Sequence, residues 1–130
     1  MASSEDGSRS ARLSLEPVPA SAARAREFVQ AHARLWDCDD PDEIVALLTT
    51  ETVANAVAHA AAPIALTLLW GSGAIRVETE DGSPELPELR APAWDDPRGR
   101  GLMLVDALAR SWGAERRGPG KVVWFEYGPC

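Results

Sequence analysis

Apolar and polar residues alternate in several short stretches of the chain, which is the pattern of β-strands with one buried face. The glycine-containing segments 71–73 and 118–120 each separate two such stretches and predict two β-hairpins. We predict five strands, near residues 12–16, 64–70, 75–79, 114–116 and 123–127.

Apolar residues at helical spacing predict three helices. The first is expected to start with Ser21 as its N-cap and to end near Trp36. Asp40 followed by Pro41 is a typical helix start, and this second helix should reach residue 59. The third helix is expected to begin after Gly101. This order of elements predicts an α/β two-layer sandwich, with a mixed, mostly antiparallel sheet and three helices on one face.

The remaining segments predict the domain organisation. Residues 1–10 are polar and rich in serine, so we expect a disordered leader followed by a single domain over residues 11–130. Residues 82–100 contain several prolines and show no periodicity. A loop of this length in a small domain is usually functional, and we expect it to act as a lid over a ligand.

Composition narrows the class of function. The net charge of −7 argues against nonspecific nucleic-acid binding, and no apolar run approaches the length of a membrane helix. The first residues lack a secretion-signal pattern. The two cysteines, Cys38 and Cys130, have neither CxxC spacing nor a nearby histidine pair, so we expect two reduced thiols in a cytoplasmic protein.

Glu51 and Asn55 lie one helical turn apart in the second predicted helix. At 100° per residue they fall at the centre of an apolar stripe, where polar groups need partners; its other members are Ile44, Leu47, Leu48, Ala54 and Ala58. Two interpretations follow. The pair either forms a satisfied intramolecular network, or Asn55 holds a cation while Glu51 acts as a base.

Two glycine-containing segments are further candidates. Asp81 and Gly82 end a predicted strand and are either an ordinary turn or an acceptor for an exocyclic amine such as that of adenine. Residues 99–102 precede the third helix and are either an ordinary helix start or a phosphate site made of free backbone N–H groups. Neither segment matches a dinucleotide-binding fingerprint or a P-loop.

Each of these segments is a weak signal alone, but their order along the chain forms a specific joint pattern. Residues 51–60, 77–84 and 99–105, followed by 120–126, resemble the ATP-binding boxes of the histidine-kinase-like ATPases, which have the Bergerat fold. The closest similarity is to anti-sigma regulatory factors, the serine/threonine protein kinases of the SpoIIAB and RsbW type, in their short actinobacterial form. The resemblance spans about residues 11–127.

The resemblance implies a role for each residue. Asn55 would hold Mg²⁺, Glu51 would be the general base, and Asp81 with Gly82 would bind the adenine of ATP. The phosphates would be reached by Gly99, Arg100, Gly101 and Leu102. The chain departs from the family pattern at Ser83 and Glu85, where glycines are expected, and at Val122, where threonine is common. These departures lower the expected affinity for ATP.

The implied function is an ATP-dependent protein kinase that sequesters a sigma factor and phosphorylates a serine of an antagonist protein. A homodimer fits the resemblance, and neither nucleic acid nor a membrane is an expected direct partner. The alternative is a non-catalytic nucleotide-binding module that acts by sequestering its partner. The presence of Glu51 favours the enzyme, because a module that only sequesters has no need of a base beside Mg²⁺.

Overall fold

The computed structural model describes residues 8–59, 63–86 and 97–129, except for the side chains of 97–102. The elements, in chain order, are β1 (Arg9–Leu15), α1 (Ala20–Leu35), α2 (Ile44–His59), β2 (Ile64–Gly71), β3 (Ala74–Asp81), α3 (Pro97–Leu108), β4 (Ser111–Arg117) and β5 (Gly120–Tyr127). The predicted order of strands and helices is therefore confirmed.

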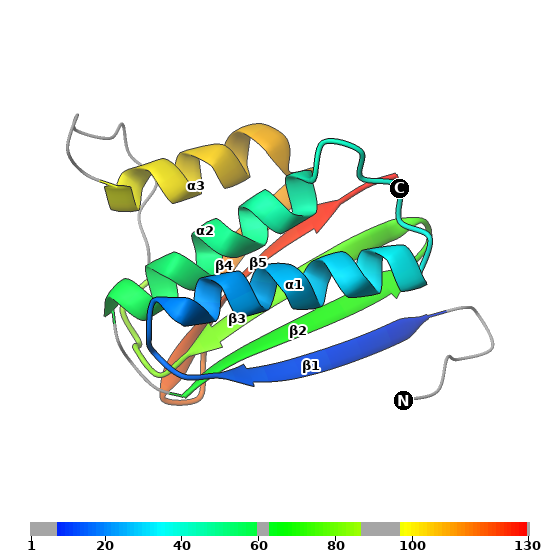
Figure 1. Ribbon diagram of the computed structural model, residues 1–130. Helices are drawn as coiled ribbons and strands as arrows, with labels where there is room; N and C mark the ends of the chain where they lie inside the picture. The colour runs from blue at the N-terminus through cyan, green and yellow to red at the C-terminus, as the bar shows by residue number, and fades with distance from the viewer. Residues whose placement is uncertain (1–7, 60–62, 87–96, 130) are drawn as a thin grey trace.

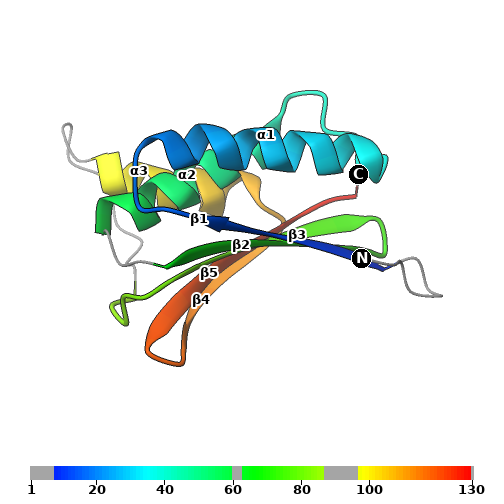
Figure 2. The same ribbon diagram turned by 60° about the horizontal axis from the view of Figure 1, so that its bottom comes forward.

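The five strands form one sheet in the order β1-β2-β3-β5-β4. Figures 1 and 2 show all three helices on one face of this sheet, which confirms the two-layer sandwich. The sheet is not mixed, because every described strand pair is antiparallel. Helix α3 does bring β4 back parallel to β3, but β5 lies between these strands and pairs antiparallel with both.

Positive backbone φ angles occur at both hairpin turns. Ser72 and Gly73 have φ of 54° and 75°, as a two-residue type I′ turn requires. Gly118 has φ of 60° in the turn between β4 and β5. The first strand extends further than expected, since Arg9 and Ser10 pair with β2. The predicted leader is thus too long by these two residues, and residues 1–7 lie outside the described part of the chain.

Two predicted helix starts need correction. Ser21 lies inside α1, and its hydroxyl donates to the backbone oxygen of Glu16 at 2.6 Å instead of capping the helix. Asp40 does cap α2, because its carboxylate accepts from the backbone N–H groups of Ile44 and Val45 at 2.7 and 2.9 Å. However, α2 begins at Ile44 and not at Pro41, since the positive φ of 54° at Glu43 interrupts the helical backbone.

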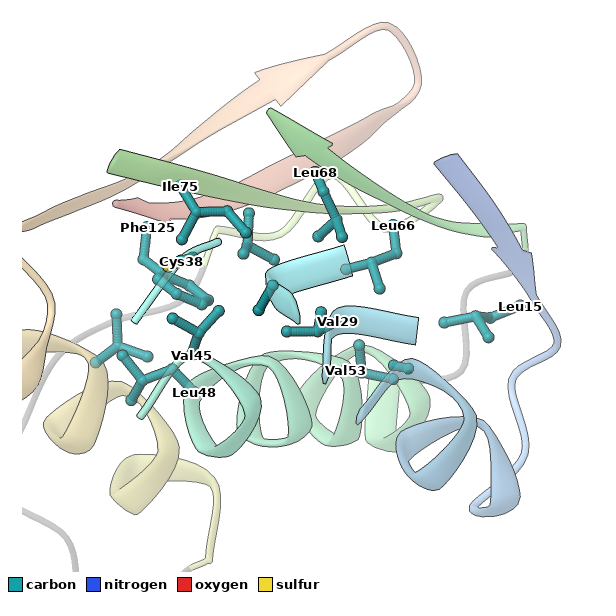
Figure 3. Packing of buried hydrophobic residues seen from close by; sticks show 14 of the residues in the cluster. Leu15, Val29, Cys38, Val45, Leu48, Val53, Leu66, Leu68, Ile75 and Phe125 are labelled. Carbon is teal, nitrogen blue, oxygen red and sulfur yellow. The ribbon is translucent and has the colours of Figure 1, made fainter. Parts of the chain in front are cut away.

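The hydrophobic core fills the space between the helices and the sheet (Figure 3). Its fully buried side chains come from all three helices and the three central strands, and include Val29, Val45, Leu48, Val53, Leu66, Leu68, Ile75, Val77, Val105 and Phe125. Burying a side chain of this size contributes roughly 1.5–3 kcal/mol, so this cluster fixes the positions of the helices on the sheet.

Cys38 is also buried in this core, and it is disulfide-bonded. The prediction of two reduced thiols is therefore wrong, and it no longer supports a cytoplasmic location. The chain's other cysteine, Cys130, lies outside the described residues. The fold partly buries Tyr127 at the end of β5 near Asp39, Asp40 and Asp42, and this burial, followed by the three negative charges, raises the pKa of Tyr127. Sequence spacing does not reveal this proximity.

Candidate functional site

The residues singled out from the sequence gather at one end of the sandwich. The end of α2, the end of β3, the beginning of β5 and the beginning of α3 all lie at the left of Figure 1. The opposite end contains the start of α2 and the hairpin turn between β2 and β3. Segments that are far apart in the sequence therefore form one end of the molecule.

The inner face of α2 is rotated from the predicted stripe. Its buried residues are Val45, Ala46, Leu48, Thr49, Thr52, Val53 and Ala56, while Ala54 and Ala58 are exposed. Glu51 and Asn55 are half-buried at the edge of this face and not at its centre. The prediction counted apolar residues only, so it missed the two threonines that point inward.

Glu51 and Asn55 have no hydrogen bond or ion pair to any side chain in the described part of the chain. Within the described residues, therefore, no intramolecular network surrounds these two side chains. Because they lie four positions apart on one helix, their side chains are neighbours on its surface. A half-buried carboxylate and amide that no described residue engages can serve a ligand directly.

A buried hydroxyl pair ties this turn of α2 to the sheet. Thr52, which follows Glu51, lies 3.2 Å from the hydroxyl oxygen of Thr79 on β3. Thr79 is two residues from Asp81, so the bond places the Glu51 turn beside the end of β3. One turn earlier, the hydroxyl of Thr49 is fully buried and has no hydrogen-bond partner in the described structure.

Asp81 is buried on the helix-facing side of β3, in line with Ile75, Val77 and Thr79. Its Oδ1 accepts from Lys121 Nζ on β5 at 3.0 Å and from the backbone N–H of Ser83 at 2.8 Å. Neither side chain of the ion pair exceeds 6% exposure. An ionised carboxylate held this way is a strong acceptor for one further donor.

Gly120 permits the close approach of β5 to the end of β3. A Cβ atom at this position would collide with the backbone oxygen of Asp81. The neighbouring Gly82 is half-buried and begins the loop that leaves the sheet. The pairing of Asp81 with Lys121 in the sheet register depends on this absence of a side chain at position 120.

The predicted phosphate segment lies inside α3 and not before it. The helix begins at Pro97, so Gly99 and Arg100 fall in its first turn and Gly101 and Leu102 follow it. Only the first four N–H groups of a helix lack an intrahelical acceptor. Because Pro97 has no N–H, the backbone donors available for phosphate in this helix are those of Arg98, Gly99 and Arg100. The predicted lid falls mainly on residues 87–96, which lie outside the described residues.

The acidic and histidine side chains of the described part of the chain form no cluster of three that could hold a metal ion. Asn55 could supply one ligand oxygen. This fits Mg²⁺, which keeps several waters and is often bound through one or two protein groups plus substrate phosphates. Within the described residues, no helix is long and apolar enough to cross a membrane.

A match to a family model decides the broad classification. The model of the histidine kinase-like ATPase domain matches residues 15–127. The chain belongs to this family. An uncharacterized protein of Streptomyces coelicolor is 40% identical over 83 residues, which cover 59% of this chain and 78% of the relative. The matched residues of the histidine kinase-like ATPase domain include every predicted site residue.

Family membership supports the binding of ATP. The sequence prediction did not assign the partners of Asp81 or the buried threonines. Lys121 could have been found, because it is in phase with Val123 and Phe125 along β5. No comparable signal marks Thr49 or Thr52, since hydroxyl side chains occur on either face of a helix.

Proposed function

We propose that this histidine kinase-like ATPase domain is an ATP-dependent serine/threonine protein kinase of the anti-sigma type. In this proposal it sequesters a sigma factor and phosphorylates a serine of an antagonist protein in the cytoplasm, and a homodimer is its working form. The net charge of −7 argues against direct binding to nucleic acid. The roles of individual residues follow the resemblance and the geometry of the polar end, which we define as the end of the sandwich with Glu51, Asn55, Asp81 and Lys121.

The observation that carries the kinase proposal is the half-buried, unpaired carboxylate of Glu51. No described residue satisfies it, and its location one turn from Asn55 places it at the same end as Asp81. A carboxylate kept in this position without a structural partner contributes little to folding. A chemical role explains it better, because a base must be free to take a proton.

In the proposed reaction Asp81 accepts a hydrogen bond from the exocyclic amine of adenine, and Asn55 contributes an oxygen to Mg²⁺. When bound, Mg²⁺ neutralises charge on the phosphates. Glu51 takes the proton of the substrate serine as its oxygen bonds to the γ-phosphorus. The bond from that phosphorus to the β–γ bridging oxygen breaks, and ADP leaves with both electrons. Positioning and electrostatics supply most of the catalysis in such transfers.

The second candidate function is a non-catalytic nucleotide-binding module. It is favoured by the departures at Ser83, Glu85 and Val122, which remove features expected around adenine. Such a module needs Asp81 but not Glu51. The two functions therefore differ in the consequence of removing the Glu51 carboxylate.

The test measures nucleotide binding and phosphoryl transfer for the wild type, Glu51→Ala and Asn55→Ala. We expect Glu51→Ala to bind ATP normally and to slow transfer to a purified antagonist by about a hundredfold to ten-thousandfold. Asn55→Ala should weaken the Mg²⁺-dependent part of binding as well. Glu27→Ala, which removes an exposed carboxylate on α1, is the matched control and should change neither property.

Unimpaired transfer by Glu51→Ala would exclude its role as the base. A wild type that binds Mg-ATP and an antagonist but never transfers phosphate would support the binding module in place of the kinase. Glu51 is half-buried and unpaired, so its removal should alter the free energy of unfolding by less than about 0.5 kcal/mol. A loss of activity can therefore be separated from a loss of structure.

A further inference from the structure

Lys121 is the only lysine among the thirteen lysine and arginine residues of the chain, and it is buried. Its ammonium lies 3.0 Å from Asp81 Oδ1, and this is its one hydrogen bond among the described residues. The exposed cations in the described part of the chain are all arginines. A single lysine at a buried position beside the predicted adenine acceptor requires a physical explanation.

Stability alone does not provide that explanation. Removing two charges from water costs several kcal/mol per ion, and well-packed apolar residues of similar volume are often as stable or more stable. Further along the same face of these two strands, the paired Val77 and Phe125 show that this sheet accepts buried apolar residues. The ion pair is therefore better explained by what it does to Asp81 than by its contribution to folding.

The geometry fixes the orientation of the Asp81 carboxylate. Lys121 approaches from β5 and the Ser83 N–H from the following loop, and both donate to Oδ1. In the described structure no donor contacts Oδ2. A lysine ammonium is a compact point charge, whereas the planar fork of arginine tends to engage both oxygens of a carboxylate. Lysine thus secures one oxygen and leaves the other for a ligand.

We propose that Lys121 is a positioning residue for base recognition: it holds the Asp81 carboxylate oriented, so that Oδ2 faces the exocyclic amine of adenine. This inference rests on the proposed nucleotide site and adds to it the residue that sets selectivity for the base. Without Lys121 only the Ser83 N–H would hold the carboxylate, which would turn more easily and discriminate poorly between an amine and a carbonyl oxygen.

The test compares ATP with inosine triphosphate, which carries an oxygen in place of the amine. Binding of each is measured by calorimetry for the wild type and Lys121→Met, which removes the charge and keeps most of the side-chain length. We expect the wild type to prefer ATP, and Lys121→Met to lose at least about tenfold of that preference. A purely structural role would change stability, or both affinities equally, and would leave the ratio unchanged.

A second comparison decides the proposal even where Lys121→Met folds poorly. In the Asp81→Asn background no carboxylate remains to be positioned, so adding Lys121→Met should leave the ratio of the two affinities unchanged. A further change in the ratio would mean that Lys121 reads the base by itself, and would overturn the proposal. The double variant contains neither buried charge, which favours its folding over that of either single variant.

Selective ¹⁵N-lysine labelling adds a direct readout, since the chain has one lysine. The Lys121 signal should shift more on binding ATP than on binding inosine triphosphate. An unchanged preference in Lys121→Met, or a lysine signal that does not respond to ATP, would overturn the inference while leaving nucleotide binding intact. A wild type that binds neither nucleotide would instead refute the proposed function itself.

Discussion

The helix-facing side of the sheet has two ends with opposite chemistry. At one end β3 and β5 contribute Ile75, Val77 and Phe125, which are completely buried and apolar. At the other end the same two strands contribute Thr79, Asp81 and Lys121, which are almost as deeply buried but polar or charged. Along β3 the alternation of buried and half-buried residues continues unchanged, and only the type of inward residue differs.

The apolar end therefore stabilises the fold, whereas the polar end is suited to serving a ligand. Apolar burial contributes roughly 25 cal/mol per Å², whereas buried polar groups cost free energy unless they are paired. The polar end pairs most of its groups, through Thr52 with Thr79 and Asp81 with Lys121, yet leaves Thr49 without a partner in the described structure. A protein gains nothing in stability from this arrangement, so we attribute it to function.

The largest expected effect is at the apolar end. Phe125→Ala should lower the free energy of unfolding by about 3–5 kcal/mol, because it leaves a cavity where α2 meets the sheet. Urea denaturation measures this loss. Leu35→Ala is a matched control: Leu35 is 67% exposed at the end of α1, and its loss should cost less than about 0.5 kcal/mol. Similar losses in the two variants would show that the core is not organised as described.

Asp81→Asn tests the polar end through both stability and binding. It leaves the buried Lys121 charge without a counter-charge, which should cost about 3–5 kcal/mol of unfolding free energy. It should also weaken ATP binding roughly tenfold to a hundredfold, because the acceptor for the amine is lost. Adding Lys121→Met should restore stability but not affinity. A double variant that regains ATP affinity would place the adenine site elsewhere.

The two buried threonines of α2 should respond in opposite directions. Thr49→Val removes a hydroxyl that has no partner in the described structure and should stabilise the protein by about 1 kcal/mol. Thr52→Val removes the partner of Thr79 and should destabilise it by roughly 1–3 kcal/mol. Thermal unfolding of both variants distinguishes them. Equal shifts in one direction would mean that neither hydroxyl is placed as described.

The smallest effect concerns Tyr127, at the apolar end of β5. Burial, followed by the charges of Asp40, Asp42 and Asp39, raises its pKa above the ordinary value of about 10. The folded state therefore favours the protonated phenol, and the stability from this linkage is present below pH ~10 and lost as pH rises through the folded pKa. Because the chain has one tyrosine, phenolate absorbance reports it directly.

Asp42→Asn should lower this pKa slightly, and unfolding in urea should return it to about 10. A phenol that titrates at the same pH in the folded and unfolded states would contradict the burial of Tyr127. The difference between the folded and unfolded pKa of Tyr127 measures how strongly the apolar end disfavours a new charge. This value sharpens the comparison with the polar end.

The sequence predicted the strands and their inward faces well, because one buried face imposes strict alternation. Ile64, Leu66 and Leu68, for example, are all buried as expected. Helix faces were harder to predict. The stripe on α2 was misplaced because Thr49 and Thr52 are polar by type but inward by position. The start of α2 was also misplaced, since a positive φ at Glu43 is not visible in the composition.

The candidate site was predicted in part for a similar reason. Local motifs identified Asp81, Asn55 and Glu51, but the ion pair between Asp81 and Lys121 depends on the register of β3 against β5. That register joins residues 40 positions apart in the sequence, and only the fold reveals it. Disulfide bonding of Cys38 was missed because it too depends on contacts that sequence spacing does not encode.

Mapping of ATP binding on backbone amide signals by NMR tests the location of the nucleotide site most directly. We predict that Mg-ATP shifts the signals of Asp81, Thr79 and Lys121, together with those of the Glu51–Asn55 turn, and leaves Ile75 and Trp70 nearly unchanged. Shifts concentrated instead around the surface hollow of about 690 Å³ lined by Arg9, Arg76 and Arg110, at the opposite end of the sheet, would contradict it.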